Sequence, residues 1–200
     1  LQLEGVTIPG QRPAIAKAVT SSVNNILVPV VPHKNSRVPD IFNALELRFR
    51  GGSSIELRVY DDGVAYRFKS AMKGTVKVRD ERFAFSLPGG AGAFWPLEKG
   101  FMSHNECTFF PASMDTIGPK HLASLPALFT SGPINILLSE ADIHDYPGLW
   151  INGDGRGGVK GVLPAYPAAV KAHNDRNVYV TGREDYLAVT SGTRTYPWRL

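Results

Sequence analysis

Apolar and polar residues alternate in two neighbouring stretches of the chain, residues 45–50 and 55–59. A period of two residues is typical of a strand with one face buried and the other exposed to solvent. A third alternating stretch, residues 64–69, follows Asp62 and Gly63 directly. Because Asp-Gly readily supplies the positive φ angles of a tight turn, the pattern predicts a β-hairpin over residues 55–69.

Shorter apolar runs continue along the rest of the chain, and Gly, Pro, Asn or Asp stands at many of the gaps between them. They predict further strands at residues 26–31, 76–78, 83–87, 134–138, 149–151, 178–181 and 186–190. Many short strands imply sheets that pack face to face, so we expect an all-β sandwich. The best helical pattern is residues 168–173, which follow Pro167 and end at Asn174.

No internal repeat, low-complexity tract or long Pro/Ser linker divides the sequence, which indicates one domain over residues 1–200. A chain that is 43% hydrophobic and 10% aromatic, with 20 Gly and 15 Pro, suits one large β domain. The formal charge of +4 comes with no basic run, so nucleic-acid binding is disfavoured. No apolar stretch approaches the roughly 20 residues that span a bilayer, and residues 1–10 lack the layout of a signal peptide.

The single cysteine, Cys107, excludes an intramolecular disulfide and a Cys-rich zinc site. His104 lies three residues before it, but a lone Cys is more often a small buried hydrophobe than a nucleophile. The longest stretches expected to be irregular are residues 88–96 and 152–161. The second contains a Gly-rich segment that lacks the Glu of an EF-hand at its twelfth position, Leu163, and the ending of a phosphate loop. We expect a flexible hairpin connection there.

An acidic segment, residues 139–145, follows the apolar run 134–138 directly. If the segment stays extended, Glu140, Asp142 and His144 project from one face. Carboxylate oxygens are the ligands that a hard cation such as calcium takes. A solvated turn after a strand is the competing interpretation, and the residues alone favour that turn.

Five aromatic residues are candidates for stacking against a sugar ring: Phe94, Trp95, Trp150, Tyr166 and Trp198. Core packing is the alternative, because aromatic side chains carry large buried areas in any sandwich. We expect one or two of the five at a ligand and the others inside. Trp95 and Trp150 are the chosen candidates for substrate contact.

Four stretches, taken in order, carry a resemblance to a known family. They are 42–45 (Phe-Asn-Ala-Leu, where the family has Tyr-Asn-Glu-Leu), 58–68 (Arg-Val-Tyr-Asp-Asp-Gly-Val-Ala-Tyr-Arg-Phe), 138–149, and 196–199 (Tyr-Pro-Trp-Arg). Residues 93–95 add a weaker match, whereas residues 1–39 are hard to place. As an ordered set, the stretches resemble the N-terminal domain of glycoside hydrolase family 97.

The resemblance implies a calcium-dependent α-glycosidase of three parts, which hydrolyses α-linked glucosides or galactosides in an oligosaccharide substrate. The parts are an N-terminal super-sandwich of two large antiparallel sheets, similar to galactose-mutarotase-like domains, a catalytic (β/α)8 barrel, and a small C-terminal β domain. By the resemblance this chain is the first part, with few short helices, and packs on the barrel. It implies a periplasmic or extracellular location.

Carried over to this sequence, the family's calcium ligand matches Glu140, and the match does not extend to Asp142 or His144. We expect the Glu140 carboxylate to be held outward at the end of a strand, as part of a calcium site that the barrel completes. No catalytic residue is expected in this chain, which should be inactive alone. The chain opens on Leu1 without an initiator Met and stops at Leu200, so we expect a segment of a longer protein, truncated at both ends.

Two other functions stay open at this point. A free-standing carbohydrate-binding sandwich would use the aromatic residues and the loop 152–161, and would bind sugar without a partner domain. A purely structural interaction module would depend on neither metal nor sugar.

Overall fold

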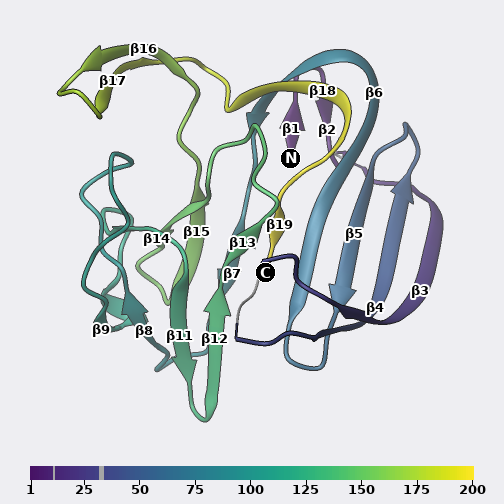
Figure 1. Ribbon diagram of the computed structural model, residues 1–200, viewed down its shortest axis with the longest axis horizontal. Coiled ribbons are helices and arrows are strands. Elements are labelled where there is room, and N and C mark those ends of the chain that lie inside the picture. The colour runs from purple at the N-terminus through teal and green to yellow at the C-terminus, as the bar shows by residue number, and fades with distance from the viewer. Residues whose placement is uncertain (11, 32–33) are drawn as a thin grey trace.

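The computed structural model describes residues 1–10, 12–31 and 34–200 (Figure 1). These residues form strands β1 to β19 and one 3-10 helix, η1 (Met114–Thr116). Strands pair antiparallel in every sheet. The prediction of an all-β fold with little helix is confirmed. Within the described ranges, no helix is long and apolar enough to cross a membrane.

One large sheet of nine strands forms the first layer, on the right in Figure 1. Its main path is β13 (Glu140–Ala141), β19 (Trp198–Arg199), β6 (Val64–Asp80), β5 (Ser54–Val59), β4 (Val38–Phe49) and β3 (Ile15–Leu27). Three further strands attach through β6: β18 (Ala188–Thr195), β1 (Gln2–Leu3) and, on β1, β2 (Val6–Thr7). The predicted hairpin is confirmed, since β5 and β6 pair from Val59↔Val64 to Ser54↔Lys69.

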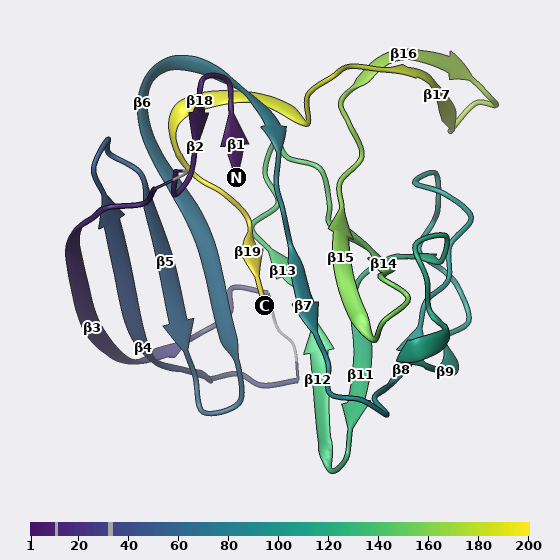
Figure 2. The same cartoon turned by 180° about the vertical axis from the view of Figure 1, so that it is seen from behind.

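Two four-stranded sheets lie on the other side of the molecule in both views (Figures 1 and 2). One orders β10 (Leu122–Ala123), β14 (Trp150–Gly153), β15 (Gly158–Val162) and β7 (Ala84–Ser86). The other orders β12 (Ile134–Leu138), β11 (Ala127–Ser131), β8 (Gly92–Trp95) and β9 (Phe110–Ser113). The second layer is therefore divided, and does not form the single large sheet that we expected.

Two hydrophobic clusters stabilise this arrangement. The first packs Trp95, Phe129 and Ile151, all 0% exposed, between the four-stranded sheets. The second packs Leu3 of β1 and Val78 of β6, both in the large sheet, with other apolar side chains. Full burial of a large apolar side chain contributes about 1.5–3 kcal/mol, so these clusters supply much of the driving force for the sandwich.

The predicted helix at residues 168–173 is wrong. β16 (Pro167–Ala172) pairs with β17 (Val178–Arg183), with Val170 opposite Val180, and the two form an arm that projects from the sandwich (Figure 1). Cross-strand hydrogen bonds satisfy the backbone of this segment, and they outweigh its weak helical pattern.

Other boundaries also differ from the predictions. β3 ends at Leu27, and the apolar residues after it are exposed, Val30 at 99%. The stretch 88–96 includes β8, and in 152–161 only the connection between β14 and β15 lies outside the strands. A side chain at Gly153 would overlap the backbone of Ile117, so this hairpin needs glycine where it approaches η1.

Candidate functional site

The acidic segment is fixed to the end of the chain by strand pairing. In β13 and β19, Glu140 lies directly opposite Arg199. Just outside this pair, the backbones of Ser139 and Leu200 exchange two hydrogen bonds of 3.0 Å. The resemblance to glycoside hydrolase family 97 rests partly on these two stretches, and the structure brings them side by side.

The Arg199 guanidinium is buried and joins two carboxylates. Its Nε donates to Oε1 of Glu81 at 2.8 Å, and its Nη1 donates to Oε2 of Glu140 at 2.5 Å. The hydroxyl of Tyr146 donates to the other oxygen of Glu81 at 2.8 Å. The backbone N–H of Leu149 donates to both oxygens of Glu140 at 3.0 Å. We call these residues, Glu81, Glu140, Tyr146, Leu149 and Arg199, the Arg199 network.

The Glu140 carboxylate is not held outward without a partner, so that expectation is wrong. Its side chain is 11% exposed and forms an internal ion pair, because Arg199 occupies the directly opposed position on the neighbouring strand. The segment does not stay extended either, since Asp142 has φ of 62°. Asp142 turns instead towards Arg67 at 3.7 Å and His144 at 3.4 Å, and does not join Glu140 on one face.

Burial and the shared charges together shift the pKa values in the Arg199 network. It raises the pKa of the Glu140 carboxyl, and neither the Leu149 N–H nor Arg199 cancels this effect. Burial alone would lower the pKa of Arg199, but Glu81 and Glu140 together outweigh it and raise that pKa. Burial, with Glu81 adding to it, also raises the pKa of Tyr146. One guanidinium therefore serves two carboxylates through Nε and Nη1, while its buried Nη2 has no hydrogen-bond partner among the described residues.

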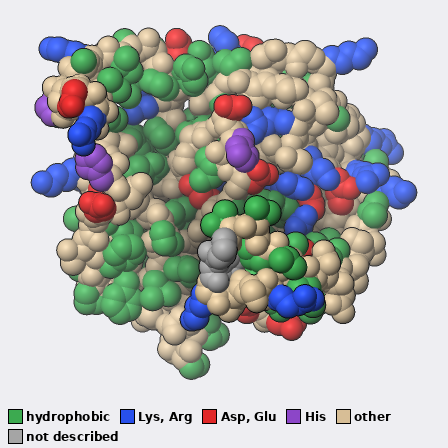
Figure 3. All heavy atoms as spheres, in the orientation of Figure 1, with side chains coloured by type: hydrophobic (Ala, Val, Ile, Leu, Met, Phe, Trp, Pro, Cys, Tyr) green, Lys and Arg blue, Asp and Glu red, His purple; other side chains and the backbone are tan. Residues whose placement is uncertain are grey.

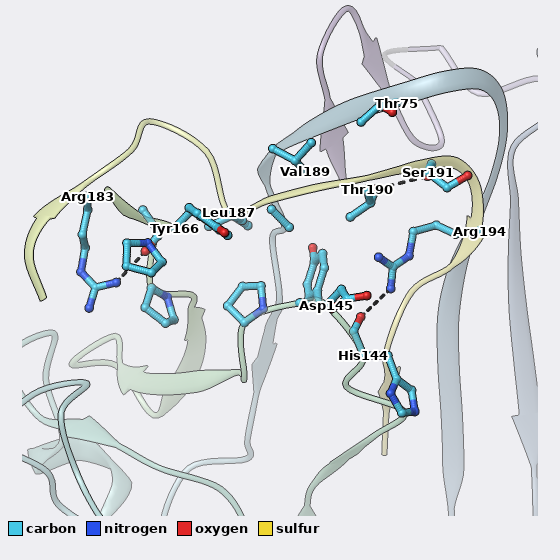
Figure 4. Close-up of a pocket in the computed structure, with 16 residues that line it drawn as sticks. Thr75, His144, Asp145, Tyr166, Arg183, Leu187, Val189, Thr190, Ser191 and Arg194 are labelled. Carbon is cyan, nitrogen blue, oxygen red and sulfur yellow. Dashed lines mark hydrogen bonds between the residues drawn. The ribbon is translucent and has the colours of Figure 1, made fainter. Parts of the chain in front are cut away.

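An open cleft of about 750 Å³ lies beside the segment that carries Glu140 (Figure 4). At one end, the ring of Tyr166 is 48% exposed and stacks on Tyr186 at a centroid distance of 5.7 Å. At the other end, Arg194 donates to the His144 carbonyl at 2.9 Å. The cleft therefore combines an aromatic face with polar groups, and Asp145 lies between them along its wall (Figure 4).

Comparison with known protein families identifies the kind of domain. The family described as "Glycosyl-hydrolase 97 N-terminal" matches residues 1–200. The chain belongs to this family. A curated relative, the retaining alpha-galactosidase of Bacteroides thetaiotaomicron, is 26% identical over 213 residues, which cover 100% of this chain and 32% of that protein. The glycoside hydrolase 97 chain thus spans about a third of the relative's length.

Solved structures show the same fold. A glycoside hydrolase family 97 enzyme from Pseudoalteromonas sp. strain K8, in complex with acarbose, matches with a TM-score of 0.75 and 19% identity. The match covers 95% of this chain and 27% of that one. A beta-arabinopyranosidase matches with a TM-score of 0.73 and 19% identity over 95% of this chain and 31% of its own. At this level of identity the likeness concerns the fold alone.

The aromatic residues are distributed differently from our expectation for this family 97 domain. Trp95 is 0% exposed, and Trp150 is 9% exposed with its ring edge-on to Phe101. Both lie in the interior, and this burial gives their expected substrate contact no support. The Trp198 ring packs against the guanidinium groups of Arg58 and Arg67, whose central carbons lie 4.5 and 4.3 Å from the ring centroid. Of the five candidates, Tyr166 is the one that borders the cleft of Figure 4.

Charged side chains concentrate over the large sheet, whereas hydrophobic ones cover much of the lower left of the molecule (Figure 3). On this sheet, Glu56 pairs with Arg58 at 3.2 Å and with Arg67 at 2.9 Å, and Lys69 pairs with Glu46 at 2.7 Å. Trp198 packs against these arginines. The charged groups pair with one another within β5 and across β4, β5 and β6, which assigns them a structural role.

The described residues alone do not offer a complete metal site. Among residues 1–10, 12–31 and 34–200, no three His, Cys, Asp or Glu side chains cluster closely enough to hold an ion. Glu140 does suit a single contribution, because two carboxylates share one guanidinium and Glu140 is the more exposed of the two, at 11% against 2%. A hard cation beside Glu140 would balance the remaining negative charge, with its other oxygen ligands coming from elsewhere.

Sequence reasoning missed Glu81 and Tyr146 altogether. Glu81 follows the long strand β6 and lacks any motif, and Tyr146 lies in the matched stretch 138–149 without an assigned role. Arg199 was noticed as the end of Tyr-Pro-Trp-Arg, but not as the partner of Glu140. The sequence contains many arginines that could pair with Glu140. Only the register between β13 and β19 identifies Arg199 as its partner.

Proposed function

We propose that this domain is the N-terminal, non-catalytic part of an α-glycosidase that hydrolyses α-linked galactosides or glucosides. The observation that carries the proposal is the family match over residues 1–200. The α-galactosidase name of the curated relative supports the α-galactoside class, and the acarbose complex of the solved structure motivates the α-glucoside class. Both proteins are about three times as long as this chain, which leaves room for a catalytic (β/α)8 barrel against which the domain packs.

We assign the catalytic acid, base and nucleophile to that barrel and none of them to this chain. The proposal places the enzyme in the periplasm or outside the cell, on family resemblance. In it, the domain has two tasks: it packs on the barrel, and it presents Glu140 at the contact between the two.

Glu140 is proposed as the domain's ligand to a calcium ion shared with the barrel. The Leu149 N–H and Arg199 hold the carboxylate in one orientation, at the partly exposed end of the Arg199 network. Most of the roughly six to eight oxygen ligands of such an ion would come from the barrel. When bound, calcium would act as a Lewis acid that orients and polarises the sugar.

The test uses the full-length protein and aryl α-galactosides and α-glucosides as substrates. The wild type should lose activity on removal of calcium with EGTA and regain it on calcium addition. Glu140→Gln keeps the size of the side chain but removes its charge, and should abolish the calcium-dependent activity. Glu106→Gln, at an exposed site, is the matched control. Wild-type activity and calcium dependence in Glu140→Gln would remove the assignment.

A second candidate function, carbohydrate binding by the domain itself, is favoured by one observation. The cleft of Figure 4 offers the half-exposed ring of Tyr166 as a stacking face. Asp145 lines the same cleft and supplies a carboxylate of the kind that binds sugar hydroxyls. Titration calorimetry with maltooligosaccharides and galactosides decides: micromolar binding that is lost in Tyr166→Ala supports this function, and absence of heat rejects it.

A further inference from the structure

We propose that Glu81 is a positioning residue for Glu140: through the shared Arg199 it leaves the Arg199 network with an excess negative charge, which strengthens cation binding at Glu140. The inference rests on the proposed function, because it concerns the calcium ligand assigned there. Its evidence is the geometry of the buried side chains.

The three charged groups form a line from the interior to the surface. The side chains of Arg199 and Glu81 are 1% and 2% exposed, whereas that of Glu140 is 11% exposed. Arg199 uses Nε for one carboxylate and Nη1 for the other, so one guanidinium serves both. Glu81 is too deeply buried to touch an ion at the surface, and it can influence such an ion only through Arg199.

The charge balance follows directly from this arrangement. With Glu140 alone, Arg199 would form a neutral pair and a cation would gain little by approaching. With Glu81 present, the guanidinium is divided between two carboxylates and the group carries a net negative charge. At a given distance electrostatic interactions are stronger in the interior than in water, because the effective dielectric constant is lower, so a cation beside Glu140 experiences the charge of Glu81.

Two further groups act on Glu81, one through a hydrogen bond and one through its charge. The Tyr146 hydroxyl donates to the oxygen that Arg199 leaves free, and the Tyr146 ring packs edge-on against Tyr196 at 5.8 Å. The other nearby cation is the ammonium group of Leu1, which donates to the Ile8 carbonyl at 3.0 Å and is attracted by Glu81. Burial outweighs the attraction of Glu81 and lowers the pKa of this amine from its usual 8.0, which reduces its countercharge to Glu81.

The loop between β13 and β14 ties both ends of the network together. Tyr146 reaches Glu81 from the middle of this loop, and the Leu149 N–H reaches Glu140 from its end. Between them, Gly148 lies so close that a Cβ there would be 3.3 Å from Oε1 of Glu140. Movement of Glu81 would therefore be transmitted to Glu140 by Arg199 and by this loop.

The experiment measures the calcium Kd of the full-length protein by titration calorimetry after EGTA treatment. Four proteins are compared: wild type, Glu81→Gln, Glu81→Asp and Glu140→Gln, with Glu106→Gln as control. Glu81→Gln should weaken calcium binding by about tenfold or more, as outer groups of metal sites do. Glu81→Asp keeps the charge and should bind calcium more tightly than Glu81→Gln, which a purely structural role would not predict.

The outcomes separate the two proposals. If Glu140→Gln weakens calcium binding and Glu81→Gln does not, the role of Glu81 is rejected and the proposed function stands. If Glu140→Gln leaves the Kd unchanged, the calcium assignment itself is rejected, and the role of Glu81 with it. Should Glu81→Gln not fold, Tyr146→Phe removes only one hydrogen bond to Glu81. A several-fold weaker Kd in that variant supports the inference, and an unchanged Kd overturns it.

Discussion

Replacing Arg199 with Met should destabilise the domain strongly. The substitution keeps an unbranched side chain but removes the guanidinium, and so leaves Glu81 and Glu140 at 2% and 11% exposure without a buried countercharge. Breaking a buried ion pair by removing one partner costs about 3–5 kcal/mol. Since a typical domain is stable by about 5–15 kcal/mol, the variant should lose a large part of its stability.

Urea denaturation of the chain, followed by tryptophan fluorescence, measures this loss. Arg48→Met is the control, because Arg48 pairs with Glu46 at 2.7 Å but its side chain is 53% exposed. Exposed pairs contribute at most about 1 kcal/mol. An Arg199→Met variant that loses no more stability than Arg48→Met would refute the importance of the Arg199 network.

The pH dependence gives a second check on the same variant. Burial already raises the pKa of Glu140 in the wild type, and loss of Arg199 should raise it further. A carboxyl whose pKa is higher in the folded than in the unfolded state destabilises the fold above that pKa and ceases to do so when protonated. Arg199→Met should therefore recover part of its stability as the pH falls from neutral towards the ordinary carboxyl pKa of 4.5.

Two further predictions concern the sandwich itself. Phe129→Ala should cost about 3–5 kcal/mol in urea denaturation, because Phe129 is 0% exposed, whereas Val30→Ala, at 99% exposure, should change stability by less than about 0.5 kcal/mol. A hydrogen bond from Lys69, ahead of smaller contributions, lowers the pKa of Glu46 from 4.5 to about 2. The stabilisation of the fold by the ionised Glu46 should be complete above pH 4.5 and lost as the pH falls through about 2. Lys69→Met should diminish this loss of stability in acid, as measured by urea denaturation at several pH values. An equal pH dependence of stability in the variant and the wild type would contradict the prediction.

The parts of the fold that the sequence predicted are those decided locally. The hairpin of β5 and β6 combines strict alternation with an Asp-Gly turn, so neighbouring residues suffice to specify it. The arm of β16 and β17 was mistaken for a helix because its strand character depends on pairing, with the partner strand supplying the hydrogen bonds. The apolar residues after Leu27 were predicted to continue a strand, but they lie outside it and are exposed. A hydrophobic run alone does not reveal what it contacts.

The candidate site was only partly predictable, for a related reason. The family resemblance singled out Glu140, and the strand at 134–138 placed it at a strand end. Its ion pair depends on the register between β13 and β19, and Glu81 joins from a third region 118 residues before Arg199 in the sequence. No spacing rule connects such distant segments, so the Arg199 network becomes visible only in the folded chain.

The most direct test is the position of calcium in a crystal structure of the full-length protein, located by its anomalous scattering. A carboxylate oxygen of Glu140 should lie about 2.3–2.6 Å from the ion, the usual calcium–oxygen distance, with further oxygens supplied by the catalytic domain. A bound calcium that Glu140 does not contact, with its carboxylate engaged only by Arg199 and Leu149, would contradict the account.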